Sequence, residues 1–159
     1  MIKSWLEDKI VQPILNLLKQ GLSPEKLSLS MAFGAVIGIF PVPGSTTLIC
    51  TLVAILLRLN LPAIQLSNYL VYPLQIALII PFIGAGAVIF QVDPPLLSVQ
   101  ELNSLFQTNF WGTITTFFDA IIYAIIAWFL ICIPLLPILY YSMIPVFKKF
   151  KVARSDTGS

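Results

Sequence analysis

The chain has 159 residues, with nine Lys or Arg, seven Asp or Glu and no His. Hydrophobic residues make up 58% of the chain and charged residues only 10%. Soluble domains are about 45–50% apolar and about 25% charged, so the composition excludes an ordinary soluble domain. We expect an all-α, polytopic integral membrane protein with proline-broken helices and an amphipathic N-terminal helix.

Several kinds of catalytic and metal site are missing from the sequence. A chain without His has no Ser–His or Cys–His pair and no imidazole to bind a metal. Its two cysteines, Cys50 and Cys132, lie far apart in apolar runs and form no CxxC motif. We therefore expect no enzyme activity, no catalytic residues, no metal and no cofactor. The net charge of +2, without a basic patch, argues against nucleic acid as a partner.

Residues 1–20 predict a separate interfacial helix. At 100° per residue, apolar side chains such as Ile2, Leu6, Ile10 and Ile14 share one broad face, and most polar side chains share the other. Charged residues occur before any long apolar run, so we expect no cleavable signal peptide. Such a helix lies in the headgroup plane of a membrane or packs against the rest of the protein.

Residues 24–58 predict a broken helical hairpin. Ser23 is a typical N-cap and Pro24 a typical first helical residue. The helix should run to about residue 40, where Pro41-Val42-Pro43-Gly44 breaks it, and a second helix should continue to Arg58. Each piece is about 20 Å long and too short to cross a bilayer. The segment is therefore either a re-entrant hairpin or one long, kinked and tilted span.

Residues 61–92 predict a second broken segment. Pro62 should open a helix, which Pro73 and Pro81 should interrupt. Pro81-x-x-Gly84 matches Pro41-x-x-Gly44 at an offset of 40, and broken helices in corresponding places are typical of transporters built from internal repeats. The pattern is a hint of such a repeat, although membrane helices contain proline often enough for a chance match.

The rest of the chain completes a single membrane domain over 21–147. Residues 93–112 predict a polar external connection, and 113–147 predict the last membrane segment, which its prolines should bend or end. Residues 148–159 predict a loose cytoplasmic tail that is basic and then polar.

The Lys and Arg residues predict the orientation. None of them lies in 93–112, so the positive-inside rule places that connection outside and both termini in the cytoplasm. If Arg58 is cytoplasmic, 27–57 form a re-entrant hairpin and 62–92 cross the membrane. If Arg58 faces outward, 27–57 cross and 62–92 return or form the hairpin.

The helix start after Gly44 is the most interesting candidate site. Its free N–H groups and positive dipole end would favour an anion, and the alternative is a plain proline kink whose hydroxyls bond within their own helix. Arg58 is either a headgroup ligand or a snorkelling anchor, and Asn60 either its partner or a helix end. Asp119 is the only acid inside a predicted membrane segment. It either has a role as a proton or ligand group or lies at the outer interface. The candidate substrate-binding residues are Pro41, Pro43, Gly44, Ser45, Thr46, Thr47, Arg58, Asn60, Asn68 and Asp119.

A stripe of small residues at four-residue spacing, Ser30, Gly34 and Gly38, predicts a helix-packing face. The stripe serves either packing within the chain or a dimer interface.

Taken together, these motifs resemble a bacterial family known as domain of unknown function 2062. The resemblance covers about residues 20–90, and the family commonly has Asn-Pro where this chain has Tyr72-Pro73. It implies a small polytopic protein of the bacterial inner membrane, and it supplies no catalytic residue. The matching motifs are Gly21-x-x-Pro24, Ser30-x-Ala32-x-Gly34, Gly38-x-x-Pro41-x-x-Gly44-x-x-Thr47 and Arg58-x-Asn60-x-Pro62-Ala63.

The expected function is that of a small transporter or lipid translocase for an anionic envelope lipid or lipid-linked intermediate. Some members of the resembled family are fused to glycosyltransferase domains, which implies an envelope setting. The alternative is a non-catalytic scaffold or accessory subunit of an envelope glycosyltransferase. The expected partners are the lipid bilayer, a second copy of the chain and such a glycosyltransferase.

Overall fold

The computed structural model describes residues 12–13, 16, 22–93 and 110–155. Over these residues the chain is helical and contains no strand, which confirms the all-α prediction. Most of the amphipathic helix predicted over 1–20 and of the connection over 93–112 lies outside the described residues. The helices with described bounds are α3 (Pro24–Gly38), α4 (Thr46–Leu56), α5 (Leu61–Leu70), α6 (Tyr72–Phe90) and α8 (Phe110–Ser155).

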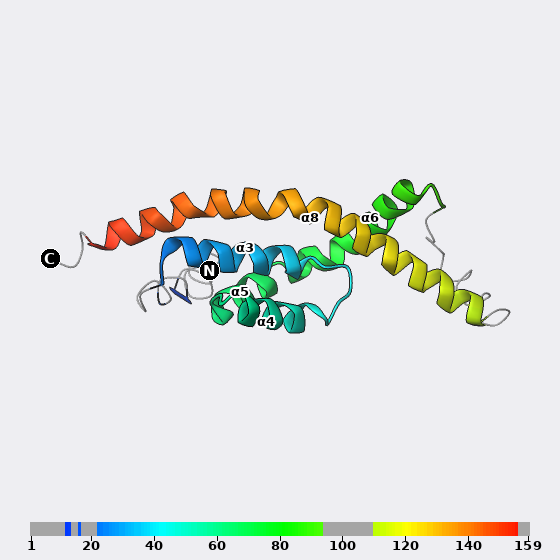
Figure 1. Cartoon of the computed structure of the whole chain (residues 1–159), viewed down its shortest axis with the longest axis horizontal. Coiled ribbons are helices and arrows are strands. Elements are labelled where there is room, and N and C mark those ends of the chain that lie inside the picture. Colours follow the sequence, from blue (N-terminus) through cyan, green and yellow to red (C-terminus); the bar gives the residue numbers. More distant parts are fainter. Residues whose placement is uncertain (1–11, 14–15, 17–21, 94–109, 156–159) are drawn as a thin grey trace, which may run out of the picture.

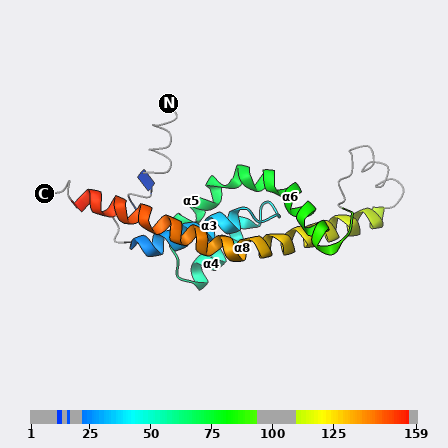
Figure 2. The same ribbon diagram turned by 90° about the horizontal axis from the view of Figure 1, so that it is seen from above.

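Helix α3 is the centre of the arrangement. It packs against α8 on one side and against α4 and α5 on the other (Figure 1). Helices α3 and α4 run antiparallel as a hairpin, α5 turns back beside them, and α6 continues from α5 toward the far end (Figure 2). Helix α8 runs along the whole molecule, beside α6 with its first half and beside α3 with its second.

Helix α3 begins where the sequence predicts. The Ser23 hydroxyl accepts a hydrogen bond from the backbone N–H of Lys26 at 3.2 Å, and Pro24 occupies the first turn. The helix ends at Gly38, two residues before the expected end, ahead of a break over 39–45. The break exists because the prolines in it cannot donate backbone hydrogen bonds and clash with a preceding helical turn.

Two helix ends meet between α4 and α5. Helix α4 ends at Leu56, two residues before the predicted end, and Arg58 follows with a left-handed φ of 53°. The N–H of Leu59 bonds Ala54 O at 2.8 Å, which is the long bond of a Schellman cap. Asn60 then caps α5, because its Oδ1 accepts from the N–H of Ala63 at 2.9 Å. Asn60 therefore lies at a helix end.

Helices α5 and α6 are separated at Val71, near the predicted interruption at Pro73. Pro73 lies in the first turn of α6, where its missing N–H does no harm. The predicted interruption at Pro81 is wrong, since α6 runs through it to Phe90. The match between Pro41 and Pro81 has no structural counterpart, because Pro41 lies in a loop and Pro81 lies inside a helix.

Helix α8 is longer than predicted. Its 46 residues correspond to about 69 Å, and it continues through Pro134, Pro137 and Pro145. These prolines do not end it, and Figure 1 shows the helix as curved. The prediction of a loose tail from residue 148 onward is also wrong up to Ser155, because α8 reaches that residue. The helix continues through its prolines because each proline removes one hydrogen bond and bends the helix without unfolding the neighbouring turns.

Two helical stretches, Tyr72–Phe90 and Ile114–Lys149, are long and apolar enough to cross a membrane. Only 22% of the most apolar window in each is buried inside the protein, whereas the core helix of a soluble domain would be mostly covered. Large apolar side chains such as Leu56, Val88 and Ile133 are exposed. Over the described residues the chain is therefore helical, with two helices that could cross a membrane and with large apolar side chains on their surface.

Candidate functional site

The break over 39–45 is closed from two sides by other helices. Helix α3 ends with unpaired carbonyl groups, as every helix does. The indole Nε1 of Trp128, on α8, donates to Val36 O at 3.0 Å, and Nε2 of Gln75, on α6, donates to Phe40 O at 2.7 Å. Such bonds matter in lipid, where an unsatisfied backbone group is expensive. The break is thus supported by protein groups at its α3 end.

The start of α4 differs from the predicted hydroxyl-lined site. Ser45 occupies the N-cap position, but its hydroxyl donates to Val42 O at 2.8 Å and makes no capping bond to α4. Thr46 is buried and Thr47 is exposed. Of the other predicted residues in the break, Pro41 is buried, whereas Pro43 and Gly44 are exposed, with φ +87° at Gly44.

The stripe of small residues lies against α5 of the same chain. A Cβ on Gly34 would collide with Ile64 O, and one on Gly38 would collide with the side chain of Val71. Ser30 accepts a hydrogen bond from the N–H of Asn60 at 3.0 Å. Because Gly34 and Gly38 have no Cβ, the backbone of α3 can lie directly against α5.

Four polar side chains on α5 and α6, which we call the polar seam, follow this contact: Gln65, Ser67, Asn68 and Gln75. Ser67 donates to Met31 O at 2.7 Å, and Gln65 donates from Nε2 to Thr47 O at 3.0 Å. Asn68 is buried and donates to Oε1 of Gln65 at 3.3 Å. The polar seam therefore joins α5 and α6 to the backbone of the α3–α4 hairpin.

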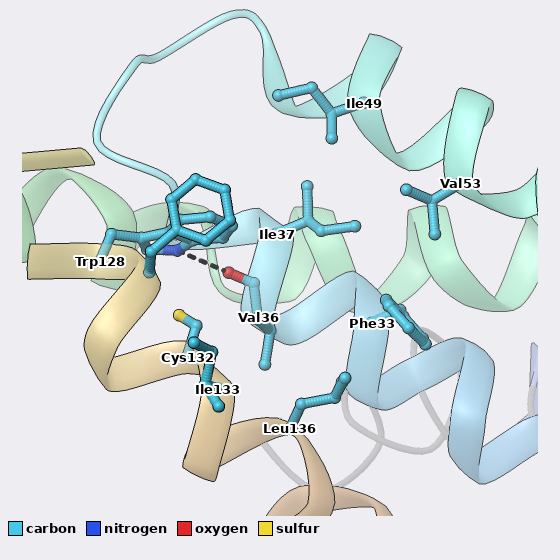
Figure 3. A pocket seen from close by; sticks show the side chains of 10 residues that line it. Phe33, Val36, Ile37, Ile49, Val53, Trp128, Cys132, Ile133 and Leu136 are labelled. Atoms are coloured by element: carbon cyan, nitrogen blue, oxygen red, sulfur yellow. Dashed lines mark hydrogen bonds between the residues drawn. The ribbon is translucent and has the colours of Figure 1, made fainter. Parts of the chain in front are cut away.

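An apolar cavity of about 250 Å³ lies between the hairpin and α8 (Figure 3). Side chains of α3, α4 and α8 line it as an open groove, and the Trp128–Val36 hydrogen bond crosses one edge (Figure 3). Its wall is almost wholly hydrocarbon, so a bound group would be apolar as well. The residues lining it are Phe33, Val36, Ile37, Ile49, Val53, Trp128, Phe129, Cys132, Ile133 and Leu136.

Basic side chains gather at one end of the molecule, which we call the basic end: Lys26, Arg58, Lys148 and Lys149. A core of Leu27, Met31, Ala63 and Phe147 brings the starts of α3 and α5 together with the last part of α8 at this end.

The basic end also contains an ion pair. Lys148 Nζ lies 3.2 Å from Oε1 of Glu25. A backbone hydrogen bond at Glu25, followed by the hydrogen bond from Lys148, holds the pKa of the Glu25 carboxyl below its ordinary value of 4.5. Both side chains are partly exposed, so solvent screens the attraction.

The structure separates the predicted substrate-binding residues into several places. Arg58 and Asn60 lie at the basic end, one length of α4, or about 16 Å, from the start of α4. Asp119 is exposed on α8, nine residues or about 13 Å before Trp128. A single anion site built from the 45–47 helix start and Arg58 is therefore not formed.

Sequence reasoning missed the roles of Trp128 and Gln75 at the break. A general signal was present, because a buried indole N–H or amide in an apolar helix must find a hydrogen-bond partner. The identity of that partner depends on packing between helices, which the sequence pattern does not contain.

The described residues form a helical protein with two helices that could cross a membrane, an apolar cavity and a basic end. The family model described as "Uncharacterized protein conserved in bacteria (DUF2062)" matches residues 9–155, so the chain belongs to this family. The match confirms the resemblance of the motifs and extends it through α8. No curated protein and no solved structure matches the chain.

Proposed function

We propose that this protein is a small transporter-like protein of the bacterial inner membrane that binds an anionic lipid and helps to move it between leaflets. The observation that carries the proposal is the apolar cavity between α3, α4 and α8 together with the four basic residues of the basic end, of which Lys26 lies on α3, Lys148 and Lys149 lie on α8, and Arg58 follows the end of α4. An amphiphile with an anionic headgroup and a hydrocarbon chain matches both parts.

The dimensions of the chain support this arrangement. Along α3, Lys26 precedes Phe33 in the cavity wall by seven residues, or about 10 Å. Along α8, Leu136 precedes Lys148 by twelve residues, or about 18 Å. A headgroup at the basic end would therefore lie about one leaflet of the hydrocarbon core away from a chain in the cavity. A volume of about 250 Å³ suits part of an acyl chain better than a whole lipid.

The charge distribution supports a re-entrant hairpin in this proposal. With the basic end at the cytoplasmic surface, α3 and α4 extend about 22 and 16 Å into a hydrocarbon core of about 30 Å. The break at their tip carries no charged residue. Helices α5 and α6 together then cross the membrane, and α8 returns to the cytoplasmic side.

Reconstituted vesicles test the proposal. Purified protein in vesicles of phosphatidylcholine with a trace of fluorescent phosphatidylglycerol should expose inner-leaflet probe to an impermeant quencher faster than empty vesicles do. The Val53→Trp variant, which fills the cavity, should slow this movement at least fivefold. Leu52→Trp is the matched control, because Leu52 is 52% exposed on the same helix. It should leave the rate unchanged.

Equal rates with and without protein would overturn the transport proposal. If the protein then copurified with an envelope glycosyltransferase and raised its activity, the accessory role expected as the alternative would take its place.

A further inference from the structure

The basic end contains a carboxylate among its cations. Glu25 lies in the first turn of α3, next to Lys26, and its Oε1 is 3.2 Å from Lys148 Nζ on α8. The other acids that the structure describes lie far from this end. Asp93 follows α6, which runs toward the far end of the molecule (Figure 1), and Asp119 precedes Lys148 by 29 residues, or about 44 Å along α8. Within the described part of the chain, Glu25 is therefore the one negative charge that an anionic headgroup would meet at the basic end.

Both partners of this ion pair are accessible from outside the protein. The exposed fraction of the side chain is 46% for Glu25 and 57% for Lys148. A headgroup that approaches the basic end can therefore contact the ammonium group directly. Because solvent screening keeps exposed ion pairs weak, another anion can replace the carboxylate on Lys148.

The ion pair can open without separating α3 from α8. Leu27 and Phe147, which lie close to the two partners in the chain, belong to one buried core at the same end. The carboxylate also keeps other support, because the backbone hydrogen bond at Glu25 lowers its pKa more than the hydrogen bond from Lys148 does. The positive end of the α3 dipole stabilises an acid in the first turn as well. A change of partner at Lys148 therefore leaves the packing of the two helices in place.

We propose that Glu25 is an internal competitor for the anionic headgroup: its carboxylate occupies Lys148 in the empty protein, and a bound headgroup takes its place. This inference rests on the proposed function. A phosphodiester oxygen accepts a charge-assisted hydrogen bond from an ammonium group as a carboxylate does. Lys26 and Lys149, which are the neighbours of the two partners in the chain, add attraction for the incoming charge. The Glu25–Lys148 pair therefore sets the concentration of anionic lipid at which the basic end fills.

Binding titrations of the purified full chain in an uncharged detergent test the competition. The ligand is dihexanoyl phosphatidylglycerol, a soluble anionic lipid, and calorimetry at constant low ionic strength measures its dissociation constant. Glu25→Gln removes the competing charge and should tighten binding about two- to fivefold, which is the range that an exposed ion pair allows. Asp119→Asn is the matched control, since it changes the net charge by the same amount at a distant exposed site. It should leave the dissociation constant unchanged.

A second variant separates competition for Lys148 from general repulsion by Glu25. Lys148→Met removes the shared partner and should weaken binding by itself. In that background Glu25→Gln should no longer tighten binding, because no ammonium group is released. An equal gain in both backgrounds would overturn the inference, since it would show repulsion without competition. Weaker binding by Glu25→Gln in the unaltered background would overturn it too, since Glu25 would then be a ligand of the lipid.

Failure of this inference can be distinguished from failure of the proposed function, because binding and lipid movement are measured separately. If neither the unaltered chain nor Glu25→Gln bound phosphatidylglycerol, both the proposed function and this inference would be wrong. If the two bound it equally and the vesicle assay showed lipid movement, only this inference would be wrong.

Discussion

Trp128 and Val36 are joined by a hydrogen bond of 3.0 Å although 92 positions separate them in the chain. The indole of Trp128 on α8 donates to a carbonyl in the last turn of α3, so one helix supplies a hydrogen bond to the end of the other. Phe40 stacks edge-on against the same ring, with centroids 4.9 Å apart. This contact holds the break beside the apolar cavity and makes Trp128 the structural link between the hairpin and α8.

Replacing Trp128 with Phe should lower the free energy of unfolding by about 1–3 kcal/mol, because it leaves a buried acceptor with one partner fewer. Equilibrium unfolding in mixed micelles measures the change. Phe118→Leu, at a site that is 63% exposed on the same helix, should change stability much less. If both variants lost the same free energy of unfolding, the indole hydrogen bond would make no specific contribution to stability.

Gly34→Ala should destabilise the fold by about 1–3 kcal/mol, since its Cβ would meet the backbone carbonyl of Ile64. Gly84→Ala offers the opposite result on α6. A Cβ there meets nothing within 4 Å, so alanine should stabilise the helix by about 0.5–1 kcal/mol. The same unfolding measurement compares the pair, and a loss at Gly84 equal to that at Gly34 would contradict the close approach of α3 to α5.

Arg58→Gly should stabilise the protein by about 0.5–1 kcal/mol, because glycine adopts the left-handed φ of 53° without steric cost. Under the proposed function it should also weaken binding of anionic lipid severalfold. Gln91→Gly is the matched control, since Gln91 has φ 54° in a second helix cap but carries no charge. It should gain stability and keep lipid affinity in vesicle sedimentation. Unchanged affinity in Arg58→Gly would remove Arg58 from the headgroup site.

The Glu25–Lys148 pair predicts a modest dependence on pH. The folded-state pKa of Glu25 lies below its ordinary value of 4.5, so the pair contributes stability above about pH 4.5. That contribution disappears as the pH falls through the lower folded-state value. Glu25→Gln should therefore lower Tm slightly at pH 7 and low salt, and not at pH 3. A difference that persisted at pH 3 would show that the effect of Glu25 is not electrostatic.

Local signals predicted the helix starts well, because caps and prolines act within one turn. Ser23-Pro24 and Asn60-Leu61-Pro62 each begin a helix in the structure as their chemistry requires. The same reasoning failed at Pro81 and at the three prolines of α8, which lie inside continuous helices. Neighbouring turns supported by packing can absorb one lost hydrogen bond, and single-chain periodicity carries no information about that packing.

The candidate site was predictable only in part, for a related reason. A break at 41–44 follows from two prolines in four residues, and the break is present. The candidate residues combined Arg58 with the start of α4, but the length of α4 separates them, as the predicted helix up to Arg58 already implied. The bonds from Gln75 and Trp128 join segments 35 and 92 positions apart, beyond the reach of any local pattern.

The bond between Trp128 and Val36 also sets an order of assembly. The hairpin of α3 and α4 is synthesised long before α8, yet α8 supplies the indole that satisfies Val36 and one wall that covers the hairpin. Until α8 is synthesised, Val36 O lacks this partner and one side of the hairpin stays uncovered. A chain truncated before Trp128 would therefore not complete the packing around the break.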